Sequence, residues 1–460
     1  MTKQNLQKNP TTDPPYSYRS EAPLPREKRI ARFLESLKAL LAAGPYQMLL
    51  SLYLDTCAKC NNCADQCQVY QATGDIRDLP AWRSDLLRRI YRKYHTLSGK
   101  LFGSLVGAKD ATTEDIDAMV DGFYRCTMCR RCAVHCPLAL DNALVTRIGR
   151  VLLGELGFAP KNMTGSVNAQ LRAGGNTSSI PKVAFLDSLD FLEEELKEET
   201  GIAIPIPRDV QGAAFLFAAP VSDYIMEADT LLGIAKTFHA AGVSWTIGTE
   251  NFDAINYGLF YSDIILEKIL NRLLAEARRL GCRTLVIGEC GHATKAGLLF
   301  QKVYGKSDYS DIQIKSILEI SHGFYKEGRL KFDPEKNKGT YTYHDPCNLG
   351  RGAGLYEEPR ELLKASVADY REMTPNREMN YCCGGGGGLV VAEDLHGWRM
   401  QVGGLKKVEQ LRAVGADTIV APCANCKKQL RELTRFHRLN MEIAGLHDVI
   451  GKALIFGEMA

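Results

Sequence analysis

Thirteen of the fifteen cysteines in this 460-residue chain fall into three groups, and this grouping constrains the fold more than any other feature. The first two groups, CAKCNNCADQC from residue 57 and CTMCRRCAVHC from residue 126, repeat one C-x2-C-x2-C-x3-C spacing. The sequence shows no signal peptide and no apolar run near the roughly 18 residues of a membrane helix. In a reducing compartment, such grouping indicates metal or redox chemistry rather than a disulfide framework.

The spacing of both groups is that of bacterial ferredoxins, which hold cubane [4Fe-4S] clusters. Three thiolates of one loop reach three corners of a cube, and the fourth cysteine reaches the other cluster. This crossing predicts Cys57, Cys60, Cys63 and Cys136 as ligands of cluster one. It predicts Cys126, Cys129, Cys132 and Cys67 as ligands of cluster two. Zinc is disfavoured, because a zinc site usually takes four ligands from two C-x2-C pairs and two such quartets would overfill it.

The first group departs from the ferredoxin pattern at Gln68, because the second group has Pro137 at the matching position. Between the groups, apolar residues at three- and four-residue intervals predict helices over 79–97 and 112–124. The basic face of the helix over 79–97 is expected to lie in solvent. We therefore expect residues 51–159 to form a helical two-[4Fe-4S] ferredoxin-like domain, preceded by an N-terminal extension over 1–50 for partner docking. The apolar face within residues 31–54 is expected to pack mainly on this domain.

A linker is predicted over 160–211, because residues 160–182 are rich in Gly, Asn and Ser and break the periodicity. It includes an acidic helix at 189–201 that we expect to be a solvated spacer. From residue 212, short apolar segments alternate with longer helical ones, which is typical of an α/β domain. Strands are predicted at 213–220, 243–248, 283–290, 340–347 and 417–423, and helices at 228–242, 262–280, 358–367 and 395–415.

The second half of this α/β region repeats the order of the first. Setting Pro220 against Pro346 and Cys290 against Cys423 aligns the ends of both pairs of strands, which indicates an internal duplication. The predicted fold is thus an α-helical two-[4Fe-4S] ferredoxin-like domain followed by an α/β domain, residues 212–460, built from two tandem repeats. The first repeat is degenerate, since Val221 and Ala293 stand where the second repeat has cysteines.

The third cysteine group lies at the expected carboxyl ends of strands in the second repeat, where open α/β sheets place their active sites. Its members are Cys347, Cys382, Cys383, Cys423 and Cys426. Five thiolates are one more than a cubane needs, which indicates either a cluster with a bridging cysteine or a cubane beside a spare thiol. Glycines 384–388 are expected to let backbone and substrate approach the metal. Cys290 is either a buried remnant or a reactive thiol near the cluster, whereas Cys282 is expected to be core.

The segments HDPCNLGR (344–351), CCGGGGG (382–388) and PCANC (422–426) resemble the CCG-domain family, named for its paired cysteines. This family occurs in the catalytic iron–sulfur subunits of heterodisulfide reductases. A two-cubane module joined to one intact CCG motif is similar to the HdrD type and, more closely, to the DsrK type and its HmcF and TmcB relatives. The resemblance covers the chain from about residue 50.

The resemblance implies that Cys347, Cys382, Cys383, Cys423 and Cys426 hold a catalytic [4Fe-4S] cluster, cubane or non-cubane, that reduces or forms a disulfide. Electrons would pass to it through the two cubanes. The alternative is a pure electron-transfer subunit without disulfide chemistry. The expected partners are redox subunits, among them a membrane cytochrome b-type subunit that interacts with quinone, and a disulfide-bearing protein or small thiol as substrate.

Other cofactors and partners are not expected. The glycine run lacks the G-x-G-x-x-G context, so we expect neither NAD nor flavin. The net charge of +3 gives no reason to expect nucleic acid. The expected location is the cytoplasm, peripherally attached to the inner face of the membrane through partner subunits. His344, Arg351, Lys427 and Lys428, which flank the third group, and His292 are candidates for proton supply or anion binding, each with a structural role as the alternative.

Overall fold

The computed structural model describes residues 23–43, 46–172, 175–303 and 308–456. They form two compact units. The first comprises the described residues up to 164 together with 260–263 and 381–407, and the second comprises the described residues within 165–259, 264–380 and 408–456. The sequence predicted 381–407 as part of the C-terminal domain, but this segment packs with the N-terminal helices.

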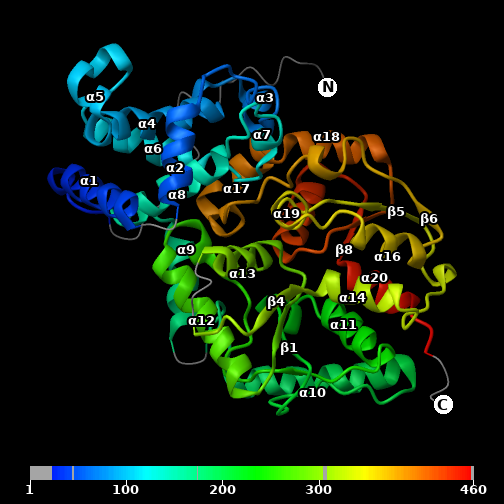
Figure 1. The fold of residues 1–460 in the computed structure, drawn as a ribbon. Coiled ribbons are helices and arrows are strands. Elements are labelled where there is room, and N and C mark those ends of the chain that lie inside the picture. Colours follow the sequence, from blue (N-terminus) through cyan, green and yellow to red (C-terminus); the bar gives the residue numbers. More distant parts are fainter. Residues whose placement is uncertain (1–22, 44–45, 173–174, 304–307, 457–460) are drawn as a thin grey trace. The chain divides into compact units, whose positions relative to one another are not determined.

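The first unit is helical (Figure 1). Its main helices are α1 (Arg26–Ala43), α2 (Gln47–Thr56), α3 (Gln68–Thr73), α4 (Pro80–His95), α5 (Leu97–Phe102), α6 (Thr113–Tyr124), α7 (Arg131–Val134) and α8 (Asn142–Gly154). Thr112 and Asp115 form a capping box at the start of α6, and the Asp141 side chain caps α8. Phe123 of α6 packs on Gly149 of α8, where a Cβ would collide with the ring. The predicted helices over 79–97 and 112–124 thus correspond to α4 and α6.

The apolar face of α1 and α2 is used mainly for packing, as predicted. Phe33, Leu37, Leu50 and Leu54 are buried, whereas Met48, Leu49 and Leu52 of α2 are exposed. Residues 1–22 of the predicted N-terminal extension lie outside the described residues. A second exposed apolar group, Leu97, Leu101, Phe102 and Leu105, lies on α5 and the turn after it. Such exposed groups are available for contacts beyond this chain.

The second unit contains two four-stranded sheets, and all strand pairs in them are parallel. The first sheet has the order β2-β1-β3-β4, with β1 (Phe215–Ala218), β2 (Trp245–Ile247), β3 (Thr284–Ile287) and β4 (Gln313–Ser316). The second has the order β6-β5-β7-β8, with β5 (Thr340–Tyr343), β6 (Asp369–Tyr370), β7 (Thr418–Val420) and β8 (Glu442–Ala444). The central strands are largely buried because both faces of a parallel sheet are covered by helices.

The two sheets share more than their strand order. Cys290 N–H donates to the Gly288 carbonyl at 2.6 Å, and Cys423 N–H donates to the Ala421 carbonyl at 2.7 Å, so the same tight turn follows β3 and β7. These are the two cysteines that the internal duplication aligns. Equivalent residues therefore leave equivalent strands in the same way.

The helices of the second unit cover these sheets (Figure 1). They are α10 (Lys182–Thr200), α11 (Asp229–Ala240), α12 (Asp263–Arg279), α13 (Gly291–Val303), α14 (Ile317–Lys326), α15 (Gly350–Ala353), α16 (Glu358–Ser366), α18 (Leu405–Val414), α19 (Ala424–Phe436) and α20 (Leu446–Ala453). Helices α11 and α20 approach closely through Gly233 and Gly451, because a Cβ on Gly451 would lie 2.5 Å from the Gly233 Cα. This contact joins the halves that carry the two sheets.

Two predictions about the linker were wrong, whereas the helix predicted over 395–415 is present. The predicted linker contains α9 (Lys161–Leu171). The acidic helix is the longer α10, which buries Phe185, Leu189, Leu192 and Leu196 and so is no solvated spacer. The predicted helix over 395–415 is present as α17 (His396–Trp398), a π-helical segment at Arg399–Gly403 and α18.

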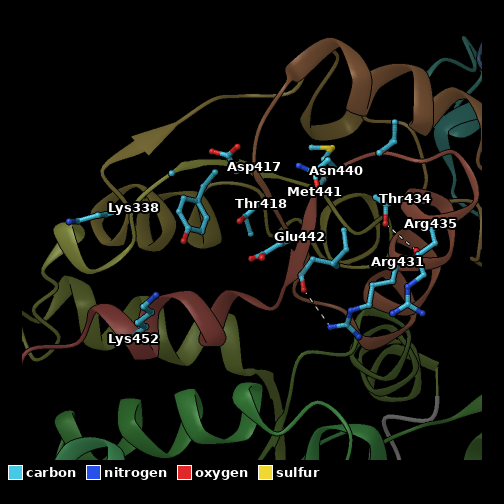
Figure 2. Close-up of a pocket in the computed structure, with 14 residues that line it drawn as sticks. Lys338, Asp417, Thr418, Arg431, Thr434, Arg435, Asn440, Met441, Glu442 and Lys452 are labelled. Carbon is cyan, nitrogen blue, oxygen red and sulfur yellow. Dashed lines mark hydrogen bonds between the residues drawn. The ribbon is translucent and has the colours of Figure 1, made fainter.

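One cavity of about 800 Å³ opens at the amino ends of β5, β7 and β8 (Figure 2). Tyr341, Thr418 and Glu442 from these strands line it, together with charged side chains such as Arg431 and Lys452. The cysteines of the third group that follow β5 and β7 lie beyond the opposite, carboxyl ends. The cavity is therefore separate from the cysteine positions.

Candidate metal centres

The first two cysteine groups adopt the same backbone. Lys59 and Met128, each two residues after the first cysteine, have φ of 54° and 53°. Asn61 and Arg130, each following the second cysteine, have φ of 63° and 65°. Such left-handed residues within a loop turn successive N–H groups inward and create concavities that favour anionic groups such as iron–sulfur clusters. Equal spacing in the sequence has thus produced equal loops.

Four cysteines line one pocket in the first unit: Cys67, Cys126, Cys129 and Cys132. This is the set that the crossing rule predicts for cluster two, with Cys67 contributed by the other group. The charge of Cys136 is among those that raise the pKa of Cys57, after burial, so these two predicted ligands of cluster one also lie near each other. The arrangement fits two crossed quartets, and the ligand assignment stays a prediction.

The electrostatics of the cysteines fit a metal centre that is bound by thiolates. Burial raises the pKa of Cys132 well above its usual range, and the neighbouring Cys129, Cys67 and Cys126 raise it further. Burial also raises the pKa of Cys63, to about 11. Packed thiols oppose one another's ionisation, and iron binding would reverse that penalty because thiolate is the form that ligates metal. The donor set is thus suited to an iron–sulfur cluster.

Two arginines of α4 are buried next to the cysteine loops, which corrects the prediction that this basic face lies in solvent. Arg83 is 2% exposed, donates to the Asp78 carbonyl at 2.7 Å and has its other nitrogen 4.0 Å from the Cys67 Sγ. Arg88 is 4% exposed and donates to the Cys57 carbonyl at 2.8 Å. Burial lowers the pKa of Arg83, but Cys126 and Cys67 raise it overall. No role was predicted for either arginine from the sequence, although both follow the first cysteine group closely.

Replacing Arg83 by methionine should make the reduction potential of cluster two more negative by on the order of 100 mV. A unit charge a few ångströms from the cysteines interacts with them by roughly 2–3 kcal/mol at the effective dielectric of protein interiors. Redox titration followed by EPR measures the shift. Arg89→Met is the matched control, because Arg89 lies on the same helix with its side chain 42% exposed. Equal potentials in Arg83→Met and the wild type would contradict the expectation.

The paired cysteines of the third group belong to the first unit. Cys382 and Cys383 are 1% and 2% exposed. The N–H of Cys382 donates to Gln68 Oε1 at 2.7 Å, and the N–H of Gly384 lies 3.4 Å from the Cys382 Sγ. The backbone of this loop is therefore held by the ferredoxin-like helices.

The glycines of this loop lie against neighbouring backbone. A Cβ on Gly386 would lie 2.5 Å from the Thr127 carbonyl oxygen, and one on Gly384 would lie 2.6 Å from the Gly404 nitrogen. A Cβ on Gly387 would lie 3.2 Å from the Cys126 carbonyl oxygen. These glycines thus admit neighbouring backbone, including that of the second cysteine loop. This packing also explains why residues 381–407 belong to the first unit.

The other three cysteines of the group lie at strand ends in the second unit, as predicted. Cys347 follows β5, Cys423 follows β7 as the residue that precedes α19, and Cys426 lies in the first turn of α19. All three are buried, at 8%, 4% and 5% exposure. A Cβ on Gly291 would lie 3.6 Å from the Cys423 Sγ, so the turn after β3 packs closely on the turn after β7.

Cys290 and His292 form a buried pair beside Cys423. The Asn256 N–H donates to His292 Nε2 at 3.3 Å, and burial lowers the pKa of His292 to about 3. His292 Nδ1 lies 3.2 Å from the Cys290 Sγ and 3.2 Å from the Asn425 side-chain nitrogen. Burial raises the pKa of Cys290, and the charge of Cys423 raises it further. Cys282 is buried as predicted, with its Sγ 3.8 Å from the Leu280 carbonyl oxygen.

Of the flanking candidates, Lys427 has a structural environment. It is fully buried, donates to Thr230 Oγ1 at 2.7 Å and pairs with Glu227 at 3.1 Å. Arg351 donates to the backbone carbonyls of Glu378 and Asn380. His344 is buried, whereas Lys428 is half-exposed.

Two regions of the chain match known protein families. Residues 53–140 match the 4Fe-4S dicluster domain, and residues 341–431 match the cysteine-rich CCG domain. The chain is 30% identical over 453 residues to the Hdr-like menaquinol oxidoreductase iron–sulfur subunit of Archaeoglobus profundus, covering 88% of this chain and 81% of that protein. The chain belongs to the family of heterodisulfide reductase-like iron–sulfur subunits.

Two further relatives support this assignment. The second iron–sulfur subunit of the Hdr-like menaquinol oxidoreductase of Archaeoglobus fulgidus is 29% identical over 476 residues, which cover 93% of this chain and 84% of that protein. One polypeptide of the dihydromethanophenazine:CoB–CoM heterodisulfide reductase of Methanosarcina barkeri is 21% identical over 407 residues, 87% of this chain and 94% of that protein. The chain is thus an electron-transferring iron–sulfur subunit related to oxidoreductases. Within the described residues, no helix is long and apolar enough to cross a membrane.

Proposed function

We propose that this subunit carries electrons through two cubane clusters to a third [4Fe-4S] cluster, where a disulfide is reduced or, in reverse, two thiols are oxidised. The ligands of the third cluster would be Cys347, Cys382, Cys383, Cys423 and Cys426. The observation that carries the proposal is the packing of the loop with Cys382 and Cys383 against the second ferredoxin-type loop. A cysteine pair that is built into the dicluster unit is suited to receive electrons from it.

The third site is proposed to be single because the first half of the α/β region lacks the matching cysteines. Both sheets have the same strand order and the same turn after β3 and β7, which supports an origin as two tandem CCG-type repeats. Val221 and Ala293 then occupy the first repeat's ligand positions, and Cys290 alone remains. Reduction of one disulfide takes two electrons and two protons and yields two thiols. The electrons would arrive one at a time through the cubanes.

The partners are proposed from the names of the relatives. The Archaeoglobus proteins are named menaquinol oxidoreductase subunits, and the Methanosarcina protein is named for dihydromethanophenazine. By analogy, a membrane cytochrome b-type subunit that interacts with quinone would exchange electrons with this chain at the cytoplasmic face. The substrate would be a disulfide-bearing protein or a low-molecular-weight disulfide.

EPR of the purified complex, oxidised in the presence of candidate thiols, tests the proposal. We expect a thiol to induce a paramagnetic signal that is absent in Cys383→Ser. Cys282→Ser is the matched control and should keep the signal, because Cys282 is buried outside the three cysteine groups. If no thiol changes the spectrum of the wild-type complex, the third cluster only relays electrons, and the alternative of a pure electron-transfer subunit is correct.

A further inference from the structure

Gln68 is the residue at which the first cysteine group departs from the ferredoxin pattern. It follows Cys67, a predicted ligand of cluster two, and begins α3. The second group has Pro137 at the matching position, after Cys136. Proline has no side-chain hydrogen-bonding group, whereas glutamine has both a donor and an acceptor. Glutamine in place of proline therefore puts a polar side chain beside a predicted cluster ligand.

Both ends of this side chain hold the backbone of the paired-cysteine loop. Gln68 Oε1 accepts from the Cys382 N–H at 2.7 Å. Gln68 Nε2 donates to the Cys382 carbonyl at 3.2 Å and to the Gly403 carbonyl at 2.6 Å. Gln68 is 1% exposed, so these bonds do not compete with water. The Gln68 amide thus makes hydrogen bonds to both the N–H and the carbonyl group of one residue, Cys382.

A second contact fixes the same loop near another predicted ligand of cluster two. The buried Arg150 donates to the Cys126 carbonyl at 2.7 Å and to the Gly387 carbonyl at 2.5 Å. Because the Gly386 position abuts the Thr127 carbonyl as well, the loop is held from the side of Cys67 and from the side of Cys126. It is thus attached to the cluster-two part of the first unit.

We propose that Gln68 is a positioning residue that fixes Cys382 relative to Cys67 and thereby sets the rate of electron transfer from cluster two to the third cluster. The inference rests on the proposed third cluster. The path from one ligand to the other runs along the bonds of Cys67 and Gln68 and crosses one hydrogen bond to Cys382. Electron transfer depends steeply on such distances, so a loosened contact slows it. Loss of a partner that orients a metal ligand typically costs roughly 10–100-fold in metal affinity or activity.

The test compares Gln68→Leu with Gln71→Leu in the full complex. Leucine is close to glutamine in size but makes no hydrogen bond, and Gln71 lies exposed on the same helix. In Gln68→Leu we expect the iron content to be unchanged and the amide of Cys382 to exchange with deuterium at least 10-fold faster. Reduction of the third cluster, followed by freeze-quench EPR after cluster two is reduced, should slow roughly 10–100-fold. Gln71→Leu should match the wild type.

A second variant separates positioning from folding. Gln68→Glu keeps an acceptor for the Cys382 N–H but places a carboxylate against two carbonyl oxygens, so its rate should lie between those of the wild type and Gln68→Leu. Unchanged exchange and an unchanged reduction rate in Gln68→Leu would overturn the proposal. Loss of iron from clusters one and two would also overturn it, in favour of a folding role. Absence of a thiol-induced signal in the wild type contradicts only the disulfide chemistry, because neither readout here needs a substrate.

Discussion

Gly386→Ala should lower the stability of the first unit by about 3 kcal/mol or more, because the added methyl group would meet a rigid backbone atom. The new Cβ would lie 2.5 Å from the Thr127 carbonyl oxygen and 3.5 Å from the Cys382 Sγ. Overpacking of a dense interior typically costs 1–3 kcal/mol, and the cost rises when the neighbour is backbone rather than a flexible side chain. Gly386 has no positive φ, so the effect is steric alone.

Thermal unfolding of the complex and its iron content measure this effect. Thr127 lies between two predicted ligands of cluster two, so we expect the variant to lose iron from the first unit as well as melting temperature. Gly165→Ala is the matched control, because Gly165 is an exposed helical glycine in α9 with nothing within 4 Å of an added Cβ. It should be neutral or slightly stabilising, since alanine favours helices. A melting temperature in Gly386→Ala equal to that of the control would contradict the packing explanation.

The sequence predicted the parts of the fold that are encoded locally. The apolar segments of β1, β3, β5 and β7 are recognisable because central parallel strands are buried on both faces. The edge strands β4, β6 and β8 were missed because they are not buried in this way. QIKS in β4 alternates between exposed and buried residues, and β6 has two residues only. Such short, partly polar segments carry little strand signal.

The parts of the candidate site that depend on the spacing of cysteines could be predicted from the sequence. The crossing of Cys67 into the quartet of the second group follows from the ferredoxin pattern, and the pocket lined by these four cysteines agrees with it. Contacts between distant segments were not predictable. Gln68 and Cys382 are 314 positions apart, so no local pattern connects them. Two features of the sequence hinted at this contact. They are the glutamine in place of proline after Cys67 and the run of glycines, which leaves room for a neighbouring segment.

Lys427→Met should destabilise the second unit by about 3–5 kcal/mol, which would lower its melting temperature by roughly 10 °C. Lys427 has no exposed side-chain surface, and its Nζ lies 3.1 Å from Glu227 and 3.9 Å from Asp223. Removing the cation takes the nearby positive charge from the buried Asp223, which is the costly way to break a buried ion pair, whereas Glu227 keeps its ion pair with Arg431. The residues come from both halves of the unit, so the network joins them.

Lys428→Met is the matched control because it makes the same substitution at the next residue. The Lys428 side chain is 46% exposed and lies 3.9 Å from Glu432, an arrangement that contributes little. We expect the control to melt like the wild type. Equal losses in both variants would mean that charge at the start of α19, rather than the buried network, determines the stability.

The pH dependence of stability provides a second test of the buried network around Lys427. Burial raises the pKa of Asp223 to about 8, even though Lys427 lowers it. Between pH 4 and 8, the folded protein then binds more protons at Asp223 than the unfolded chain, so stability falls as pH rises through this window. Without Lys427 the carboxyl pKa rises further, and we expect the fall in Lys427→Met to extend above pH 8. Asp223→Asn should remove this part of the slope, matching the wild type at low pH and exceeding its melting temperature at pH 9. A steeper fall in Asp223→Asn than in the wild type would show that Asp223 is ionised when paired with Lys427 and contradict the protonated state.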